Sequence, residues 1–270
     1  MSIVREGEAN ASGMLLAMRI VSLSPAATEI LFSLGLGKDI VCTDQFSNFP
    51  EEAKAIPHLR GHTEVRPEEL TKFNPDIVLT GTVIQQKLAQ ELRGKGFQVI
   101  HQDARTLAQV FESIRELGVI FVGEERAVEL IQKVQREFDS VKRKAKNLPR
   151  RPRVYIEEWH QPPMASGNWV PEVVQIAGGK SFPIIAGELS REVMLEEVQA
   201  FDPDLIVISW CGAGKLADKK LLIERERWGS LRAVHSGSLK VIDDSFLNRP
   251  GPRLAEGAQR LFGWMFEMLH

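Results

Sequence analysis

Carboxylate, imidazole and thiol side chains that could bind a metal gather around one predicted strand. The stretch YIEEWH is predicted to be extended, and the two-residue period of a strand places Glu158 and His160 on one face. Cys211 follows a second predicted strand, and His62 or His101 would approach from the opposite side. These side chains suit zinc, but their spacing matches no metal motif. We therefore assign no metal site, and we keep axial ligation of a ligand's own metal by His62 or His160 as the alternative.

No motif in the sequence indicates a catalytic centre. The glycine-rich stretches match neither a P-loop nor a dinucleotide fingerprint. Gly212 and Gly214 follow a predicted strand and are a weak cue for phosphate binding. A positioned pair of nucleophile and base is not visible either. We therefore expect a protein that binds its ligand without converting it, with no catalytic residue and no catalytic cofactor. The rival interpretation is a cytosolic enzyme or chaperone with a two-lobed architecture, and a third is a leaderless ligand sensor or store.

A short pattern occurs once in each half of the chain. Residues 68–78 read EELTKFNPDIV and residues 196–206 read EEVQAFDPDLI. Each copy is predicted to be a short helix that leads into a strand, because the residue before a proline avoids the helical conformation. Glu68 and Glu196 therefore occupy equivalent places in two similar lobes. Two exposed carboxylates at matched positions could receive two cationic side chains of a symmetric partner.

Predicted strands and helices alternate in both halves. The predicted strands cover residues 19–23, 39–42, 75–80, 97–100, 154–156, 204–209 and 239–242, and the predicted helices include residues 88–95, 171–177 and 253–269. Such alternation predicts βαβ units and parallel sheets. Between the halves, one apolar stripe at three- and four-residue steps predicts a helix of about twenty residues. Its members are Ala127, Leu130, Ile131, Val134, Phe138 and Val141.

These patterns predict an α/β protein with two Rossmann-like lobes, whose central parallel sheets are joined through one long backbone helix. We expect a loose N-terminal extension at residues 1–18, an N-terminal α/β lobe at 19–123, the linking helix at 124–148 and a C-terminal α/β lobe at 149–270.

Charge, cysteine content and the N-terminal sequence limit the partners and the compartment that we expect. The formal net charge is −2, and the basic run after residue 141 lacks interleaved aromatic residues, so we expect a helix end and no nucleic-acid site. Cys42 and Cys211 are expected to be two buried thiols; a disulfide between them would need an oxidising compartment. The polar N-terminus has no apolar core typical of an export signal. We expect either a cytoplasmic protein or one whose leader was removed or misassigned.

Several stretches together resemble the cobalamin-binding members of the class III periplasmic binding proteins, which are the substrate-binding components of ABC importers for cobalamin, siderophores and haem. They are RIVSLSPAATEILFSLG, SNFPEEA, the two EE…PD copies, PPMASGNWVPEVVQIAGG and RPGPRL. The resemblance covers about residues 19–270. It implies two α/β lobes joined by one long helix, with the ligand held in the cleft between them. It also implies that Glu68 and Glu196 contact arginines of the two permease subunits.

The resemblance also implies which residues form the ligand pocket. Carried over by position, they are Ser24, Pro25, Phe46 and His62 in the first lobe, and Glu158, Trp159, Trp169, Trp210, Phe246 and Arg249 in the second. A large, flat, amphipathic ligand needs such aromatic walls with a few polar anchors. His62 stands where the cobalamin-binding members carry an aromatic residue, and the chain has a single tyrosine, Tyr155. A haem-like ring or a ferric chelate therefore remains open beside cobalamin and related corrinoids.

The expected function is that of a monomeric substrate-binding protein, which binds cobalamin or another metal chelate as the transported ligand and docks on a permease dimer with its ATPase. By resemblance it would be periplasmic or held at the cell surface. The alternatives are an iron-siderophore or haem-binding protein of the same fold, or a leaderless cytosolic protein that handles tetrapyrroles.

Overall fold

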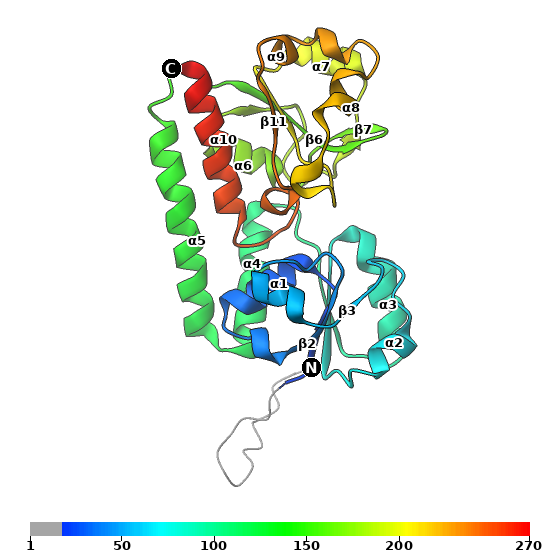
Figure 1. The fold of residues 1–270 in the computed structure, drawn as a ribbon. Helices are drawn as coiled ribbons and strands as arrows, with labels where there is room; N and C mark the ends of the chain where they lie inside the picture. The colour runs from blue at the N-terminus through cyan, green and yellow to red at the C-terminus, as the bar shows by residue number, and fades with distance from the viewer. Residues whose placement is uncertain (1–17) are drawn as a thin grey trace. The chain divides into compact units, whose positions relative to one another are not determined.

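The computed structural model describes residues 18–270 and divides into two compact units (Figure 1). The first unit contains the described residues up to Ala104 together with Phe111–Ile131, and the second contains Arg105–Val110 and Gln132–His270. The predicted loose extension lies, apart from its last residue, outside the described part of the chain. No helix within residues 18–270 is long and apolar enough to cross a lipid bilayer.

A five-stranded parallel sheet forms the centre of the first unit, in the order β3-β2-β1-β4-β5. The strands are β1 (Ile20–Ser22), β2 (Ile40–Asp44), β3 (His58–Leu59), β4 (Ile77–Gly81) and β5 (Val99–Gln102). The helices are α1 (Pro25–Ser33), α2 (Pro67–Thr71) and α3 (Gln86–Gly94), with 3-10 turns η1 (Gly37–Asp39), η2 (Glu51–Ala55) and η3 (Val83–Gln85). The predicted parallel α/β pattern of this half is confirmed.

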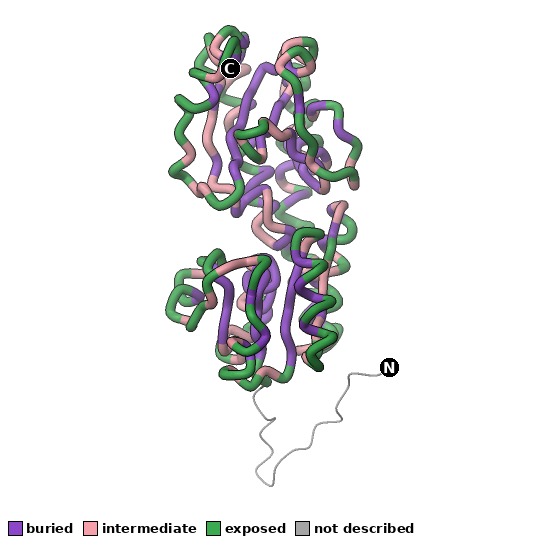
Figure 2. Tube along the Cα trace, turned by 90° about the vertical axis from the view of Figure 1, so that its right-hand side faces the viewer, coloured by how far each residue is buried: buried purple, intermediate pink, exposed green. Residues whose placement is uncertain are grey.

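Helices cover both faces of the first sheet. Side chains alternate along a strand, so Val21 packs with Leu88 and Leu92 of α3, whereas Ser22 on the other face meets Thr28 of α1. Helix α1 begins where the sequence predicts, because the Ser24 hydroxyl accepts from the N–H of Ala27 and proline occupies the first helical position. Figure 2 shows strands as buried segments beneath more exposed helix surfaces.

Two long helices, α4 (Leu107–Phe121) and α5 (Glu124–Ala145), follow the first sheet along the chain. The bend between them is tight: Gly123 has a φ of 92°, and a Cβ on Gly118 would lie 2.5 Å from the Cβ of Ala127. Helix α5 has 22 residues; five members of the predicted apolar stripe are buried, and the sixth, Ile131, is half-buried. The long helix expected from the sequence is therefore present, with lysine and arginine in its last turn.

The second unit is built on a six-stranded mixed sheet. Its strands are β6 (Arg153–His160), β7 (Pro163–Ala165), β8 (Lys180–Ser181), β9 (Arg191–Glu192), β10 (Leu205–Ile208) and β11 (Leu239–Val241), and their order is β11-β10-β6-β7-β9 with β8 also paired to β6. Strands β6, β10 and β11 are parallel, as predicted, and the two-residue strand β8, which was not predicted, runs parallel to β6. The antiparallel strands β7 and β9 were not expected, because segments of two or three residues show too little period-two alternation to be recognised.

The helices of the second unit are α6 (Val170–Ile176), α7 (Leu195–Phe201), α8 (Lys219–Ile223), α9 (Arg232–His235) and α10 (Leu254–Leu269), with 3-10 turns η4 (Gly214–Leu216), η5 (Trp228–Ser230) and η6 (Asp244–Phe246). Helix α10 packs on α6 in Figure 1. One core cluster joins Tyr155, Ile206 and Leu239 of the sheet to Trp228 and Val198. Apolar burial of this kind is the main favourable contribution to folding.

Candidate functional site

The carboxyl ends of strands β1 and β4 are the expected ligand-binding position of the first unit. The chain runs from β1 outward to β2 and β3, then returns to the other side of β1 with β4. In open parallel sheets, ligands bind at such a switch point, outside the carboxyl ends of the strands. Ser24 and Gly81 are close together there, because a Cβ on Gly81 would lie 2.8 Å from the Ser24 hydroxyl oxygen. Ser24 is buried and Pro25 is half-buried, so both expected pocket residues lie at this edge.

A buried carboxylate organises the adjacent loop. Asp44 ends strand β2 and is 1% exposed. Its Oδ1 accepts from the Ser47 hydroxyl at 2.6 Å, and its Oδ2 pairs with Nδ1 of His62 at 2.8 Å. Ser47 also lies 2.9 Å from the hydroxyl of Thr28. A buried charge is stable only when it is paired and hydrogen-bonded in this way.

The Gln85 amide fixes the backbone at His62. Gln85 is fully buried; its Oε1 accepts from the Gly81 N–H, and its Nε2 donates to the carbonyls of Leu23 and His62 at 2.8 and 2.6 Å. Both amide hydrogens are therefore used. A carboxylate only accepts, so Nδ1 of His62 must carry the proton that it donates to Asp44. Asp44 and Gln85 position the expected pocket residue His62, and sequence reasoning missed both.

An exposed aromatic side chain contacts His62, and an exposed aliphatic one adjoins its partner Gln85. The ring of Phe46 meets the His62 ring edge-on, with centroids 5.5 Å apart and an interplanar angle of 85°. Phe46 is 37% exposed, and Ile84, beside Gln85, is 58% exposed. Exposed apolar groups beside a few oriented polar atoms are typical of a ligand-binding surface. Ile84 was missed because an isolated exposed isoleucine has no sequence signature.

The second unit also presents apolar side chains after parallel strands. Trp159 lies near the end of β6 and is 39% exposed, Ile185 follows β8, and Leu216 follows β10 and is 92% exposed. Strands β6, β8 and β10 are parallel, so these residues belong to the carboxyl edge of the sheet. Of the three, only Trp159 was expected from the sequence.

Three of the expected pocket residues pack inside their own unit. Trp169 and Trp210 are each 3% exposed, and their indole N–H groups donate to Leu247 O at 2.7 Å and to the Glu157 carboxylate at 3.0 Å. Phe246 is also buried, and the guanidinium groups of Arg253 and Arg260 each lie 4.2 Å from its ring centroid. These internal contacts leave almost no side-chain surface for a ligand, which runs against the expected role. Arg249 is half-buried.

Glu158, His160 and Cys211, which the sequence suggested as metal ligands, make other contacts in the structure. Burial raises the pKa of the Glu158 carboxyl, which accepts from Ser190 at 2.6 Å. Desolvation, and then the nearby Glu158 charge, raise the pKa of Cys211 to about 12, so the neutral thiol predominates at pH 7. The His160 ring packs against Trp210 in a tilted arrangement, with centroids 4.8 Å apart and an interplanar angle of 39°.

No three His, Cys, Asp or Glu side chains within residues 18–270 gather as a metal site would require. His101, the other histidine considered, pairs its Nδ1 with Thr80, and its Nε2 is buried with no partner among the described residues. The two cysteines, Cys42 and Cys211, are both free thiols. Cys42 is buried as expected, but Cys211 is an exposed loop residue, so the prediction of two buried thiols is wrong for Cys211.

A buried ion pair braces the strand that carries Glu158 and Trp159. Glu157 is fully buried and accepts two hydrogen bonds from Arg225, at 2.9 and 2.8 Å, and one from Tyr155 at 3.0 Å. Arg225 also donates to the His160 carbonyl at 2.9 Å. Sequence reasoning missed this pair, because 68 residues separate its members and no local pattern signals a long-range partner.

The repeated pattern becomes a repeated local structure. Glu68 is the second residue of α2 and Glu196 is the second residue of α7, and both are exposed. Asn74 and Asp202, which precede the prolines, both adopt the left-handed conformation, with φ of 42° and 45°. The equivalence predicted from the two sequence copies is therefore present in the backbone of each unit.

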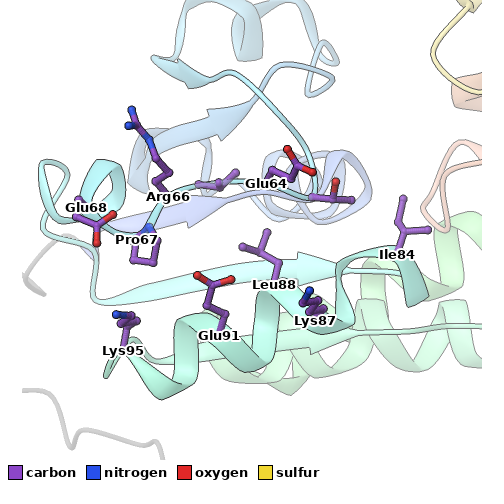
Figure 3. A pocket seen from close by; sticks show the side chains of 11 residues that line it. Glu64, Arg66, Pro67, Glu68, Ile84, Lys87, Leu88, Glu91 and Lys95 are labelled. Atoms are coloured by element: carbon purple, nitrogen blue, oxygen red, sulfur yellow. The ribbon is translucent and has the colours of Figure 1, made fainter.

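A cavity of about 540 Å³ lies beside Glu68 on the first unit. Figure 3 shows the carboxylates of Glu68 and Glu91 and the amine of Lys95 around the same hollow. Lys87 and Glu91 line it from one face of α3, and Lys95, the residue after the helix, lines it as well. The glutamate expected to dock on a permease therefore stands next to a polar recess able to receive part of a partner.

Comparison with protein families identifies the class. The model of the periplasmic binding protein family matches residues 20–246. This chain therefore belongs to the periplasmic binding protein family, and the resemblance drawn from the sequence is confirmed. The family consists of binding proteins and not of enzymes.

Individual relatives are distant but cover nearly the whole chain. An uncharacterised ABC transporter substrate-binding lipoprotein of Bacillus subtilis is 26% identical over 90% of this chain and 78% of its own length. A vitamin B12-binding protein of Vibrio cholerae is 26% identical over 91% of this chain and 88% of its own length.

Solved structures share the fold. A periplasmic haem-binding protein from Roseiflexus sp. RS-1 superposes with a TM-score of 0.82 at 22% identity, covering 94% of this chain and all of that one. The periplasmic vitamin B12-binding protein of Vibrio cholerae gives a TM-score of 0.75 at 20% identity, covering 93% of this chain and 98% of its own. At these identities the likeness concerns the fold alone.

Proposed function

We propose that this chain is the substrate-binding component of an ABC importer. It binds cobalamin or a related corrinoid through loops at the carboxyl ends of its strands, and it docks on a permease dimer through Glu68 and Glu196. The proposal keeps the predicted division into lobes at residues 19–123 and 149–270, with the linking helix at 124–148. Family membership supports the class of protein.

The observation that carries the docking half is the match between the two glutamates. Each is the second residue of a short helix, each side chain is exposed, and each helix is followed by a left-handed residue and a proline. A single exposed glutamate in a first helical turn is explained by the helix dipole. Two glutamates at equivalent positions, one on each unit, fit a permease dimer that carries two equivalent cationic groups.

The proposal that the chain binds a corrinoid rests on the exposed apolar and polar side chains at the ends of its strands. A corrin or porphyrin ring has a broad apolar face, polar substituents at its edge and a metal at its centre. Phe46, Ile84 and Trp159 offer apolar surface at the carboxyl ends of strands, while His62 and Glu158 offer oriented polar atoms. A haem-like ring would use the same groups. It is the second candidate, favoured by the imidazole of His62, which could bind the metal of such a ring.

A ligand panel tests the proposal. Purified protein is titrated with cyanocobalamin, diaquocobinamide, ferric protoporphyrin IX and a ferric hydroxamate siderophore, and binding is followed by absorbance and by isothermal calorimetry. We expect saturable binding of one tetrapyrrole per chain, with the ligand recovered chemically unchanged. Consumption of the ligand would point to an enzyme. Absence of saturable binding by every compound would contradict the ligand half.

A further inference from the structure

We infer that His62 is an axial ligand for the metal of the bound ring, so that the cargo is a metal tetrapyrrole with an open or exchangeable axial position. This inference rests on the proposed function and narrows its ligand class. A corrinoid with a free cobalt face or an iron porphyrin satisfies it. A ferric siderophore, whose iron is fully coordinated by its own oxygen atoms, does not.

The proton on Nδ1 leaves Nε2 as the coordinating atom. Nδ1 donates to Asp44, and the nearby Gln85 nitrogen, 3.3 Å from it, has both hydrogens directed at carbonyl oxygens. Nε2 has no hydrogen-bond partner among the described residues, yet it is not one of their buried unsatisfied atoms. It is therefore open to solvent, on a ring that keeps 22% of its side-chain surface exposed.

This arrangement has the features of a metal-binding histidine. A ligating imidazole usually donates its other N–H to a carboxylate or carbonyl, which fixes the tautomer and makes the ligating nitrogen more basic. Asp44 is itself held by the Ser47 hydroxyl at 2.6 Å, so the carboxylate cannot turn away. The His62 backbone is fixed as well, because its carbonyl accepts from Gln85 at 2.6 Å. Such rigidity favours axial ligation, which needs the lone pair at one place.

The surroundings fit a flat ring over the imidazole. An axial imidazole stands perpendicular to the ring it ligates, and the ring then rests on whatever lies beside the imidazole. Phe46 packs edge-on to His62, and Val83 and Ile84 precede the Gln85 that holds it. All three side chains are exposed and apolar. In the coordination step, the Nε2 lone pair replaces a water on the metal, and no electron is transferred.

The experiment compares rings that differ only in their metal. Ferric protoporphyrin IX and metal-free protoporphyrin IX are titrated into the full chain and into its His62→Ala variant. We expect the wild-type chain to shift the iron ring to an imidazole-ligated visible spectrum. The variant should lose that spectrum and bind the iron ring about tenfold or more weakly, while the metal-free ring binds both proteins equally. Diaquocobinamide and dicyanocobinamide, with exchangeable and blocked axial positions, form the matching corrinoid pair.

Two further variants separate ligation from misfolding. His62→Gly opens a space, and added imidazole should restore the ligated spectrum, which no structural role of His62 would produce. Asp44→Asn should weaken binding of the metal-containing ring about 10- to 100-fold, as loss of such a carboxylate partner does. His58→Gln, an exposed histidine of the same unit, serves as the matched control and should change nothing.

The outcomes distinguish this inference from the function on which it rests. If a ring or a siderophore binds but wild type and His62→Ala give identical spectra and affinities, axial ligation is overturned and the carrier function stands. If none of the compounds binds, both fail. A ligated spectrum lost in His62→Ala and restored by imidazole in His62→Gly supports the inference and shows which ring is taken.

Discussion

Glu68 and Glu196 hold the same position, the second residue of a short helix, in the two units of the chain. Each is followed by a glutamate with a different task. Glu69 accepts from Arg66 at 2.8 Å, and Glu197 accepts from Arg191 and from the backbone N–H of Met194. In each helix, then, the second glutamate is used internally while the first remains exposed, although Arg227 reaches Glu196 at 3.1 Å.

The two kinds of glutamate should differ in their contribution to stability. We expect Glu197→Gln to lower the free energy of unfolding by about 1 kcal/mol, because charge-assisted hydrogen bonds to the helix start are weakened. Glu196→Gln should cost less than about 0.5 kcal/mol, since exposed ion pairs contribute little. Urea denaturation measures both. A larger loss for Glu196→Gln than for Glu197→Gln would mean that the exposed glutamate has a structural role after all.

The buried pair Glu157–Arg225 should be the costliest contact to break. Arg225→Met leaves the fully buried Glu157 charge without its guanidinium partner, so we expect a loss of about 3–5 kcal/mol in the free energy of unfolding. Arg227→Met removes an arginine whose ion pair is exposed and should cost less than about 1 kcal/mol. Denaturation of the two variants side by side checks the difference, and equal losses would contradict it.

Asp204 should make stability depend on acid pH. Burial alone would raise the pKa of this carboxyl, but hydrogen bonds from Arg150, the Arg153 backbone and Arg232 outweigh it and lower the pKa to about 2. A carboxyl with a depressed folded-state pKa stabilises the fold above its unfolded pKa of about 3.9 and loses this contribution as the pH falls toward 2.

The comparison of wild type with Asp204→Asn isolates this effect. We expect wild type to be more stable by on the order of 2 kcal/mol at pH 7, with roughly half of that advantage gone by pH 3. Unfolding in urea across this pH range provides the measurement. An advantage that stays constant down to pH 3 would show that the carboxylate is not held in its charged form by these arginines.

The tryptophans should separate into ligand-facing and internal residues. Trp159→Ala should weaken ligand binding about tenfold, a loss of about 1.4 kcal/mol, with little effect on stability, because its side chain is 39% exposed. Trp210→Ala should instead destabilise the fold by about 3–5 kcal/mol, because it empties a packed site and removes the indole hydrogen bond to the buried Glu157 carboxylate. Calorimetric titration measures ligand affinity and thermal unfolding measures stability for both variants. A stability loss for Trp159→Ala together with a loss of affinity alone for Trp210→Ala would contradict the prediction.

Much of the fold could be predicted from local pattern. Ser24 and Pro25 mark the start of α1, the apolar stripe from Ala127 to Val141 marks α5, and the two EE…PD copies mark matched helix–strand units. These features lie within a few residues of each other, where propensity, capping and periodicity act directly. Strands β7 and β9 were not predicted, because segments of two or three residues are too short to show the alternation of a strand.

The candidate site was predicted less completely, because its decisive contacts are long-range. Asp44 meets His62 across 18 residues and Gln85 meets Leu23 across 62, and nothing in the intervening sequence announces either pairing. The exposure of a tryptophan side chain cannot be predicted from the local sequence either. Trp159 and Trp210 both come at the ends of apolar strands, yet only Trp159 points outward, since the indole of Trp210 turns in toward Glu157.

The most direct test of the carrier account is uptake through the cognate permease and ATPase reconstituted in liposomes, with wild type compared with the Glu68→Ala, Glu196→Ala double variant. The account predicts that the variant binds ligand with unchanged affinity while ligand uptake falls to the background without binding protein. Glu51→Ala with Glu125→Ala, two other exposed glutamates, is the control for lost charge. Uptake by the Glu68 and Glu196 variant at the wild-type rate would contradict the account.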